Sequence, residues 1–302
     1  MTPWKFLGVN VDLFLSPSPS LKLWVPHATF PTEIYHLIFE NLQGSQVDLA
    51  NLCLVCSSFR DTAERFLYCE VHVDEERLLN FCDVVRRWCT ASRIRVLHCR
   101  IKGDFPKDDV RVVAMALQKA VNLHELDITV LGPNLNPATI LSGCRFRLKR
   151  FHSSWALHQI LGFIKTQPYL QHWGCNSVCK SADKIHFPTA LLPNLASIDV
   201  VGIGGIYYSG RRLRLTRFRT QLDISHDATV DKIVYFLQSV GSTVTSLGIS
   251  LTPPRISWRS QYNFERIVSK TPALVFLRVF DSSPLVSPYY LIHSAQKHAN
   301  SH

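Results

Sequence analysis

The first clear hydrophobic pattern lies in residues 30–44, FPTEIYHLIFENLQG. Apolar residues recur there with the i, i+3, i+4 and i+8 spacing of one helix face, at Ile34, Leu37, Ile38 and Leu42. Pro31 and Glu33 suit the first turn of a helix, and Gly44 is placed to end it. The spacing therefore predicts an amphipathic helix between Pro31 and Gly44.

A second helical pattern follows Asp48, a residue type that favours the N-cap position. Its apolar positions again have helical spacing, at Leu52, Val55, Cys56 and Phe59. Cys53 and Cys56 would then lie one turn apart on one helix, at a spacing that zinc knuckles and dithiol redox sites also use. No further ligands follow at a matching spacing, and the pattern places neither thiol at a helix N-terminus. We therefore expect both cysteines to pack in a helical core.

After residue 73, short apolar triplets alternate with longer segments. The triplets fill the first, fourth and sixth positions of a unit that resembles L-x-x-L-x-L, and the units start at Ile94, Leu123, Leu148, Leu170, Leu195, Leu215, Val244 and Leu274. The shortest separation is 20 residues, from 195 to 215, and the longest is 30 residues, from 244 to 274. This spacing is close to that of leucine-rich repeats.

Several return segments between the triplets have helical periodicity, in residues 110–120, 156–165 and 230–240. Alternation of strands and helices predicts parallel strands in a curved solenoid, so the expected fold class is α/β. The units are irregular, because Ser153 and Thr220 fill two of the sixth positions. A non-repetitive α/β domain is the alternative.

The chosen register assigns each strand residue to a face. The fourth-position residues should point inward and stack as one row, and they include Leu126, Ile198, Phe218, Leu247 and Leu277. Charged residues should project from the opposite, concave face, namely Glu125, Asp127, Arg150, His152, Asp199, Arg217 and Arg219. We interpret this face as a target-binding surface, and an ordinary solvated face is the alternative.

The N-terminal helical region resembles an F-box of the type common in fungal F-box proteins. The resemblance covers about 45 residues and is carried by Phe30-Pro31-Thr32-Glu33-Ile34, Ile38, Leu42, Asp48-Leu49, Leu52, Leu54-Val55-Cys56, Phe59-Arg60, Ala63, Leu67-Tyr68 and Val71. The sequence departs from the family at Phe30, where Leu is usual, and at Ser57, where a basic residue is common. An ordinary helical hairpin of a larger core is the alternative.

The resemblance implies a three-helix module that docks on a Skp-family adaptor and thereby joins a cullin RING ubiquitin ligase. The adaptor-binding residues that it implies are Pro31, Ile34, Ile38, Leu42, Leu52, Val55 and Phe59. An F-box followed by an irregular leucine-rich-repeat domain also resembles fungal F-box proteins, in which the second domain holds the substrate. The target protein is not indicated.

The expected organisation has four parts. These are a loosely ordered extension (1–28), the F-box (29–73), the leucine-rich-repeat-like domain (74–280) and a loosely ordered tail (281–302). Apolar residues make up 46% of the chain and charged residues 19%, which is typical of a packed globular protein. No apolar run approaches the roughly 20 residues that span a bilayer, so no membrane association is expected.

Nine cysteines, an odd number, and the lack of an N-x-Ser/Thr acceptor favour a reducing compartment, cytoplasmic or nuclear. The net charge of +10 suits an acidic protein partner, an anionic surface or nucleic acid, and the charge alone does not choose among them. Nucleic acid is disfavoured, because no recognition motif accompanies the charge.

Catalytic motifs are not found; the closest string, VGIGG at 201–205, lacks the third glycine of a dinucleotide fingerprint. We therefore expect a non-enzymatic substrate receptor without a cofactor or metal. The alternatives are a basic scaffold or nucleic-acid-binding protein with a degenerate F-box, and a small hydrolase whose site is built from dispersed residues.

Overall fold

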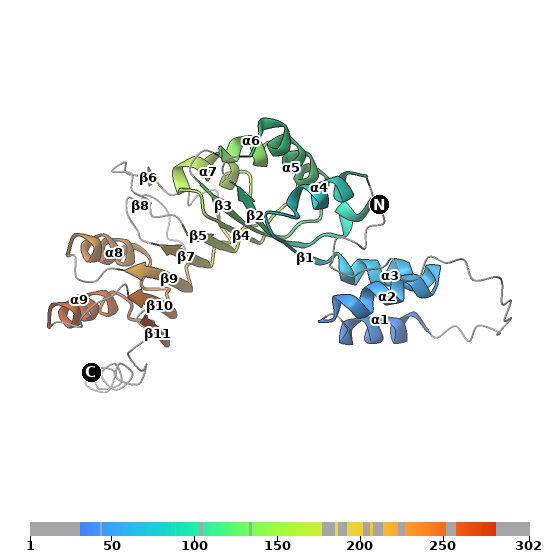
Figure 1. Cartoon of the computed structure of the whole chain (residues 1–302). Helices are drawn as coiled ribbons and strands as arrows, with labels where there is room; N and C mark the ends of the chain where they lie inside the picture. The colour runs from blue at the N-terminus through green and yellow to red at the C-terminus, as the bar shows by residue number, and fades with distance from the viewer. Residues whose placement is uncertain are drawn as a thin grey trace, which may run out of the picture. The chain divides into compact units, whose positions relative to one another are not determined.

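A computed structural model describes much of the chain. The described residues are 31–42, 44–87, 89–102, 105–132, 135–176, 185–186, 192–201, 206–207, 214–222, 227–251 and 258–281. The fold is mixed α/β, with a nine-stranded parallel sheet in the order β1-β2-β3-β4-β5-β7-β9-β10-β11 (Figure 1). The expected extension, residues 1–28, and residues 282–302 of the expected tail lie outside the described residues.

The chain divides into two compact units. The first contains Met1–Leu135 and Thr139–Phe146, and the second contains Asn136–Ala138 and Arg147–His302. The first unit thus holds both the helical region and the first strands of the sheet. The predicted boundary after residue 73 stays a prediction.

Three helices open the first unit: α1 (Thr32–Asn41), α2 (Gln46–Val55) and α3 (Ser57–Leu67). Helix α1 ends before Gly44, as its spacing predicted. Helix α2 begins earlier than expected, because the Ser45 side chain accepts a hydrogen bond from the Asp48 backbone N–H at 3.4 Å and caps the helix. Asp48 therefore lies in the first turn, and its assignment as the N-cap was wrong.

Cys56 separates α2 from α3. Its backbone is extended, with φ −159° and ψ 169°, so it ends one helix and precedes the next. The expectation that Cys53 and Cys56 share one helix was therefore wrong. A single extended residue changes the chain direction, so two helices occupy a stretch where the periodicity indicated one.

The rest of the first unit alternates strands and helices. In chain order these are β1 (Glu70–Val73), α4 (Leu78–Arg87), the 3-10 helix η3 (Cys89–Arg93), β2 (Val96–Lys102), α5 (Lys107–Lys119) and β3 (Glu125–Leu131). Strand β2 pairs in parallel with both β1 and β3. The short helix α6 (Pro137–Leu141) spans residues of both units.

The second unit also contains both strands and helices. Its main elements are β4 (Arg150–Ser153), α7 (Leu157–Ile164), β5 (His172–Cys175), β7 (Ser197–Val201), β9 (Arg217–Leu222), α8 (Asp227–Val240), β10 (Ser246–Leu251), α9 (Trp258–Val268) and β11 (Phe276–Asp281). The short strands β6 (Ile185–His186) and β8 (Ile206–Tyr207) form a separate parallel pair. Asp281, assigned to the tail, ends strand β11. Helices α5, α7 and α8 confirm the three predicted helical return segments.

Seven strands, β2, β3, β5, β7, β9, β10 and β11, start with the same backbone arrangement. Two consecutive N–H groups donate to the carbonyl of the residue just before the neighbouring strand; for example, the N–H groups of His124 and Glu125 both donate to Arg95 O, at 2.8 and 3.0 Å. The carbonyls that accept such a pair are those of Cys69, Arg95, Lys149, Gln171, Ala196, Thr216 and Thr245. Because this contact uses only backbone atoms, it holds the register whatever the side chains are.

The predicted repeat register agrees with the strands residue by residue. Each of the eight predicted unit starts lies two residues before a strand, as Leu123 lies before β3 and Leu215 before β9. Parallel pairing was also expected and is confirmed. One further repeat was missed. This repeat starts at Tyr68 and contains β1, in a stretch that was assigned to the F-box. The curved solenoid stays a prediction.

The fourth-position residues lie on the buried face, as predicted. Leu126, Ile198, Phe218 and Leu247 are buried, while Leu277, on the last described strand, is half-buried. Strand pairing places Ile198, Phe218, Leu247 and Leu277 in register as one row in the second unit. The irregular sixth-position residues Ser153 and Thr220 are also buried, so these two polar side chains occupy core positions.

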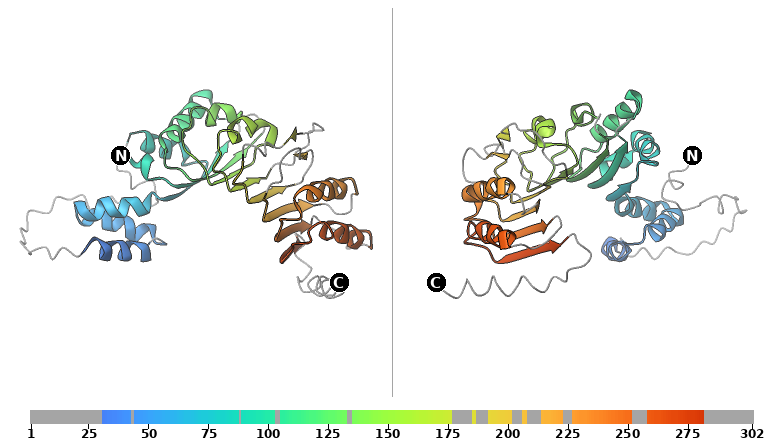
Figure 2. Two further views of the ribbon diagram at one scale, coloured as in Figure 1. Left: turned by 180° about the vertical axis from the view of Figure 1, so that it is seen from behind. Right: turned by 60° about the vertical axis from the view of Figure 1, so that its left-hand side comes forward.

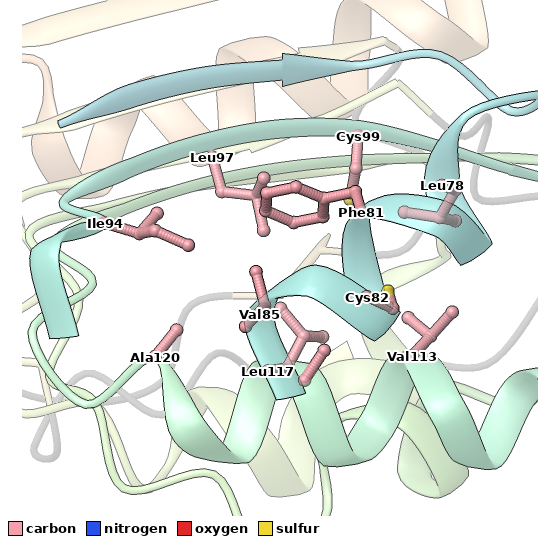
Figure 3. A pocket seen from close by; sticks show the side chains of 11 residues that line it. Leu78, Phe81, Cys82, Val85, Ile94, Leu97, Cys99, Val113, Leu117 and Ala120 are labelled. Carbon is pink, nitrogen blue, oxygen red and sulfur yellow. The ribbon is translucent and has the colours of Figure 1, made fainter. Parts of the chain in front are cut away.

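Helices cover this buried face in each unit (Figure 2). In the second unit, Phe218 of β9 contacts Phe236 of α8, with ring centroids 5.1 Å apart. In the first unit, α4, α5 and β2 surround a small apolar pocket (Figure 3). Burial raises the pKa of the Cys82 thiol in this pocket to about 12. We call the other side of the strands the open face.

Candidate docking surface and charged sheet face

Helices α1, α2 and α3 pack around a core of their own. The buried members of this core are Phe39, Leu49, Ala50, Cys53, Ala63, Leu67 and Tyr68. Aromatic rings fix α1 against α3: Tyr35 and Phe59 meet edge to face with centroids 5.1 Å apart, and Phe39 contacts the same ring at 5.9 Å. This core therefore holds α1 and α2, whose outer sides carry exposed apolar residues.

Helix α1 has two apolar sides. Tyr35, Phe39 and Leu42 face the core with i, i+4 and i+7 spacing. The other side exposes Ile34, Leu37 and Ile38 to solvent. On α2, Leu54 and Val55 are also exposed.

We call these five exposed side chains the aliphatic surface: Ile34, Leu37, Ile38, Leu54 and Val55. Their exposed fractions range from 39% to 63%. Several exposed aliphatic side chains on a small helical module are typical of residues that a protein partner covers.

The implied adaptor residues divide into two groups. Pro31, Ile34, Ile38 and Val55 are exposed. Leu42, Leu52 and Phe59 are half-buried and pack against the helical core, so they support the surface more than they form it. Sequence reasoning did not single out Leu37 and Leu54, the other two members of the aliphatic surface, as docking residues.

The two cysteines of the opening helical region have different environments. Cys53 is fully buried, and its thiol donates to the Arg60 carbonyl at 4.0 Å, while Arg60 Nε donates to the Cys53 carbonyl at 3.0 Å. Burial, with a smaller contribution from the nearby Glu64 carboxylate, raises the pKa of the Cys53 thiol to about 12. Cys56 is exposed. The packing interpretation is therefore confirmed for Cys53 and wrong for Cys56.

Arg93 joins the helical core to the strands of the same unit. It lies at the end of η3, and its Nη2 contacts Asp61 Oδ1 at 2.7 Å while its Nη1 contacts Glu64 Oε2 at 2.7 Å. Its Nη1 also donates to the Asp61 carbonyl at 3.3 Å. Since Asp61 and Glu64 both belong to α3, this guanidinium fixes α3 against the segment that precedes β2.

The open face carries the charged residues that the register predicted. Glu125, Asp127, Asp199 and His152 are half-buried there, and Arg150, Arg217 and Arg219 are exposed. Arg219 Nη1 lies 3.4 Å from Asp199 Oδ2 across the β7–β9 pair. Gly248, beside Arg219 in the register, leaves room for the arginine stem, because a Cβ at that glycine would lie 3.1 Å from Arg219 Cγ.

Sequence reasoning missed several open-face residues of the first unit. Glu70 and His72 lie on β1 and His98 lies on β2; His72 and His98 are in register beside Asp127 of β3, and Glu70 is one row away, in register with Val96 and Glu125. Glu70 and His72 were missed because the repeat that starts at Tyr68 was missed, and they fill its third and fifth positions. Extending the repeat pattern one unit upstream would have found them.

Comparison with known proteins does not assign the chain to a family. No protein-family model matches it, and no curated protein matches it either. Among the described residues, no helix combines the length and the apolar character needed to cross a membrane.

Proposed function

We propose that this protein is the substrate-recognition subunit of a Skp–cullin–F-box type ubiquitin ligase. The observation that carries the proposal is the aliphatic surface, because solvent-exposed Ile, Leu and Val side chains lie on the helices that resemble an F-box. Covering them with an adaptor would remove apolar area from water without disturbing the core beneath. The protein itself would supply no catalytic group.

The open face is the proposed site for the target protein. It carries both acidic and basic side chains, and Asp199 and Arg219 pair across neighbouring strands, so it suits a partner of mixed charge. Binding there would raise the concentration of the target near a charged ubiquitin-conjugating enzyme. Acidic residues among the arginines count against a polyanion, and therefore against the nucleic-acid alternative.

The test measures binding of the full-length protein to a purified Skp-family adaptor by calorimetry. The variant Ile38→Asp/Val55→Asp places two charges in the proposed contact. Each charge should cost about 2 kcal/mol or more when the contact is desolvated. Two such losses correspond to a Kd weakened by roughly 1,000-fold or more.

A matched control places the same charge outside the helical module. Val121 is 47% exposed, close to the 44% of Ile38, and precedes β3 in the same unit. Val121→Asp should bind the adaptor like the wild type. The double variant Arg217→Glu/Arg219→Glu should also keep adaptor binding but recover less of its target in affinity purification from cells.

Two results would contradict the proposal. One is a folded wild-type protein that does not bind the adaptor at all. The other is an Ile38→Asp/Val55→Asp protein that binds as tightly as Val121→Asp. Strong, salt-dependent binding of oligonucleotides would favour the nucleic-acid alternative instead.

A further inference from the structure

Four side chains with metal-binding atoms meet on the open face of the first unit. They come from three neighbouring strands: Glu70 and His72 from β1, His98 from β2 and Asp127 from β3. The parallel register pairs His72 with His98 and His98 with Asp127. Glu70 lies two residues before His72, so its side chain projects from the same face.

The contacts within this group are close. His72 Nε2 lies 3.0 Å from Glu70 Oε1, and the rings of His72 and His98 stack with centroids 4.4 Å apart and planes 3° from parallel. One ligand atom each from Glu70, His72 and His98 all lie within 4.8 Å of one another. The backbone beneath them is fixed by continuous strand pairing.

We propose that Glu70, His72 and His98 form a binding site for Zn²⁺. Two imidazoles and one carboxylate are a ligand set that zinc favours, whereas Mg²⁺ and Ca²⁺ favour oxygen ligands. Zinc bonds of about 2.0–2.2 Å require the three atoms to move somewhat closer together. Rotation about the second side-chain torsion of each histidine supplies this movement, because that torsion is soft.

Asp127 acts as a positioning residue for His98. Its Oδ2 lies 3.6 Å from His98 Nδ1. This separation is slightly longer than a hydrogen bond, and a small rotation of the His98 ring would let the carboxylate accept from Nδ1–H and leave Nε2 to bind the metal, an arrangement that recurs around zinc. Three protein ligands leave a fourth position, which water or a side chain of a bound partner would fill.

The experiment uses the untagged full-length protein, stripped with chelator and then titrated with ZnCl₂ by calorimetry. One equivalent of zinc should bind with a Kd on the order of 1 µM or tighter, and 10 mM Mg²⁺, a concentration of about 10⁴ times that Kd, should not displace it. His98→Ala should weaken binding at least 100-fold. Asp127→Asn should weaken it by roughly 10- to 100-fold, the usual effect of losing such a support.

The control is His152→Ala. His152 fills the same fifth position on β4, but its Nε2 faces Asn176 Oδ1 at 3.2 Å instead of a carboxylate. This variant should bind zinc like the wild type. If His98→Ala fails to fold, Glu70→Gln serves in its place, because the Glu70 side chain is 54% exposed.

Cobalt gives a second readout of the same site. Co²⁺ in place of zinc should produce visible absorption bands that the His98→Ala protein lacks. The proposal is overturned if wild-type protein binds no zinc at 100 µM, about 100 times the expected Kd. It is equally overturned if His98→Ala, or Glu70→Gln in its place, and His152→Ala bind zinc alike, since the metal would then lie elsewhere.

Discussion

Replacing Arg93 with Ala would remove the ion pairs that join α3 to the segment before β2. The guanidinium is 24% exposed and contacts Glu64, which is 21% exposed, at 2.7 Å. A hydrogen-bonded ion pair at such a half-buried place contributes about 1.5–3 kcal/mol. The second partner, Asp61, is 54% exposed and is well screened by solvent, so its contribution is smaller, about 0.2–1 kcal/mol.

The expected loss for Arg93→Ala is therefore about 2–4 kcal/mol in the free energy of unfolding of the first unit. Urea denaturation followed by circular dichroism measures this loss. Hydrogen–deuterium exchange locates it, because peptides from α3 and β1 should exchange faster while peptides from the second unit should not change.

Arg65→Ala is the matched control. Arg65 Nη2 contacts the same carboxylate, Asp61 Oδ2, at 3.1 Å, but it lies on α3 itself and is 63% exposed. Its loss should cost no more than about 0.5 kcal/mol. If the Arg93 and Arg65 variants are equally stable, with equal exchange in α3, the reasoning about this ion pair is refuted.

Three further predictions concern packing, thiol accessibility and titration. Gly241→Ala should destabilise the second unit by about 3 kcal/mol or more, because the added Cβ would overlap the Lys270 carbonyl. Gly162→Ala should instead stabilise α7 by about 0.5–1 kcal/mol, because the space around Gly162 is open. Thermal unfolding of both variants measures these opposite changes in stability. At pH 8, iodoacetamide should label Cys56 rapidly and Cys53 only after unfolding. Since the Cys53 pKa is raised from 9.0 to about 12 in the folded state, its thiol stays protonated there while it ionises in the unfolded chain, and stability should fall as the pH rises from about 9 to 12. A Cys53→Ala protein with the same alkaline slope as the wild type would contradict this assignment.

The repeat register could be predicted because each unit obeys one simple rule. A residue such as Leu123 or Leu215 is buried at the turn before a strand, and alternation then decides which side chains face the core. Irregular residues did not hide the pattern, since Ser153 and Thr220 still occupy inward positions. The spacing of the repeats therefore predicted the register even where a polar residue fills an apolar position.

Other features could not be predicted from periodicity. The helical spacing continues through Cys56 although one extended residue separates two helices there, so the break leaves no trace in the pattern. Helix α1 is apolar on two sides, and the pattern cannot tell which side meets the core. Phe39 faces inward while Ile38 faces solvent, a choice made by the aromatic contacts with α3.

The paired amide contacts at the strand starts have an evolutionary consequence. Because the carbonyl of Arg95 or Thr216 fixes the next strand without help from any side chain, residues on the open face can be exchanged while the register stays the same. Mutations there would alter what the face recognises and leave folding largely unaffected. New binding preferences could thus arise by single substitutions on the open face, one repeat at a time, while the strand register stays unchanged.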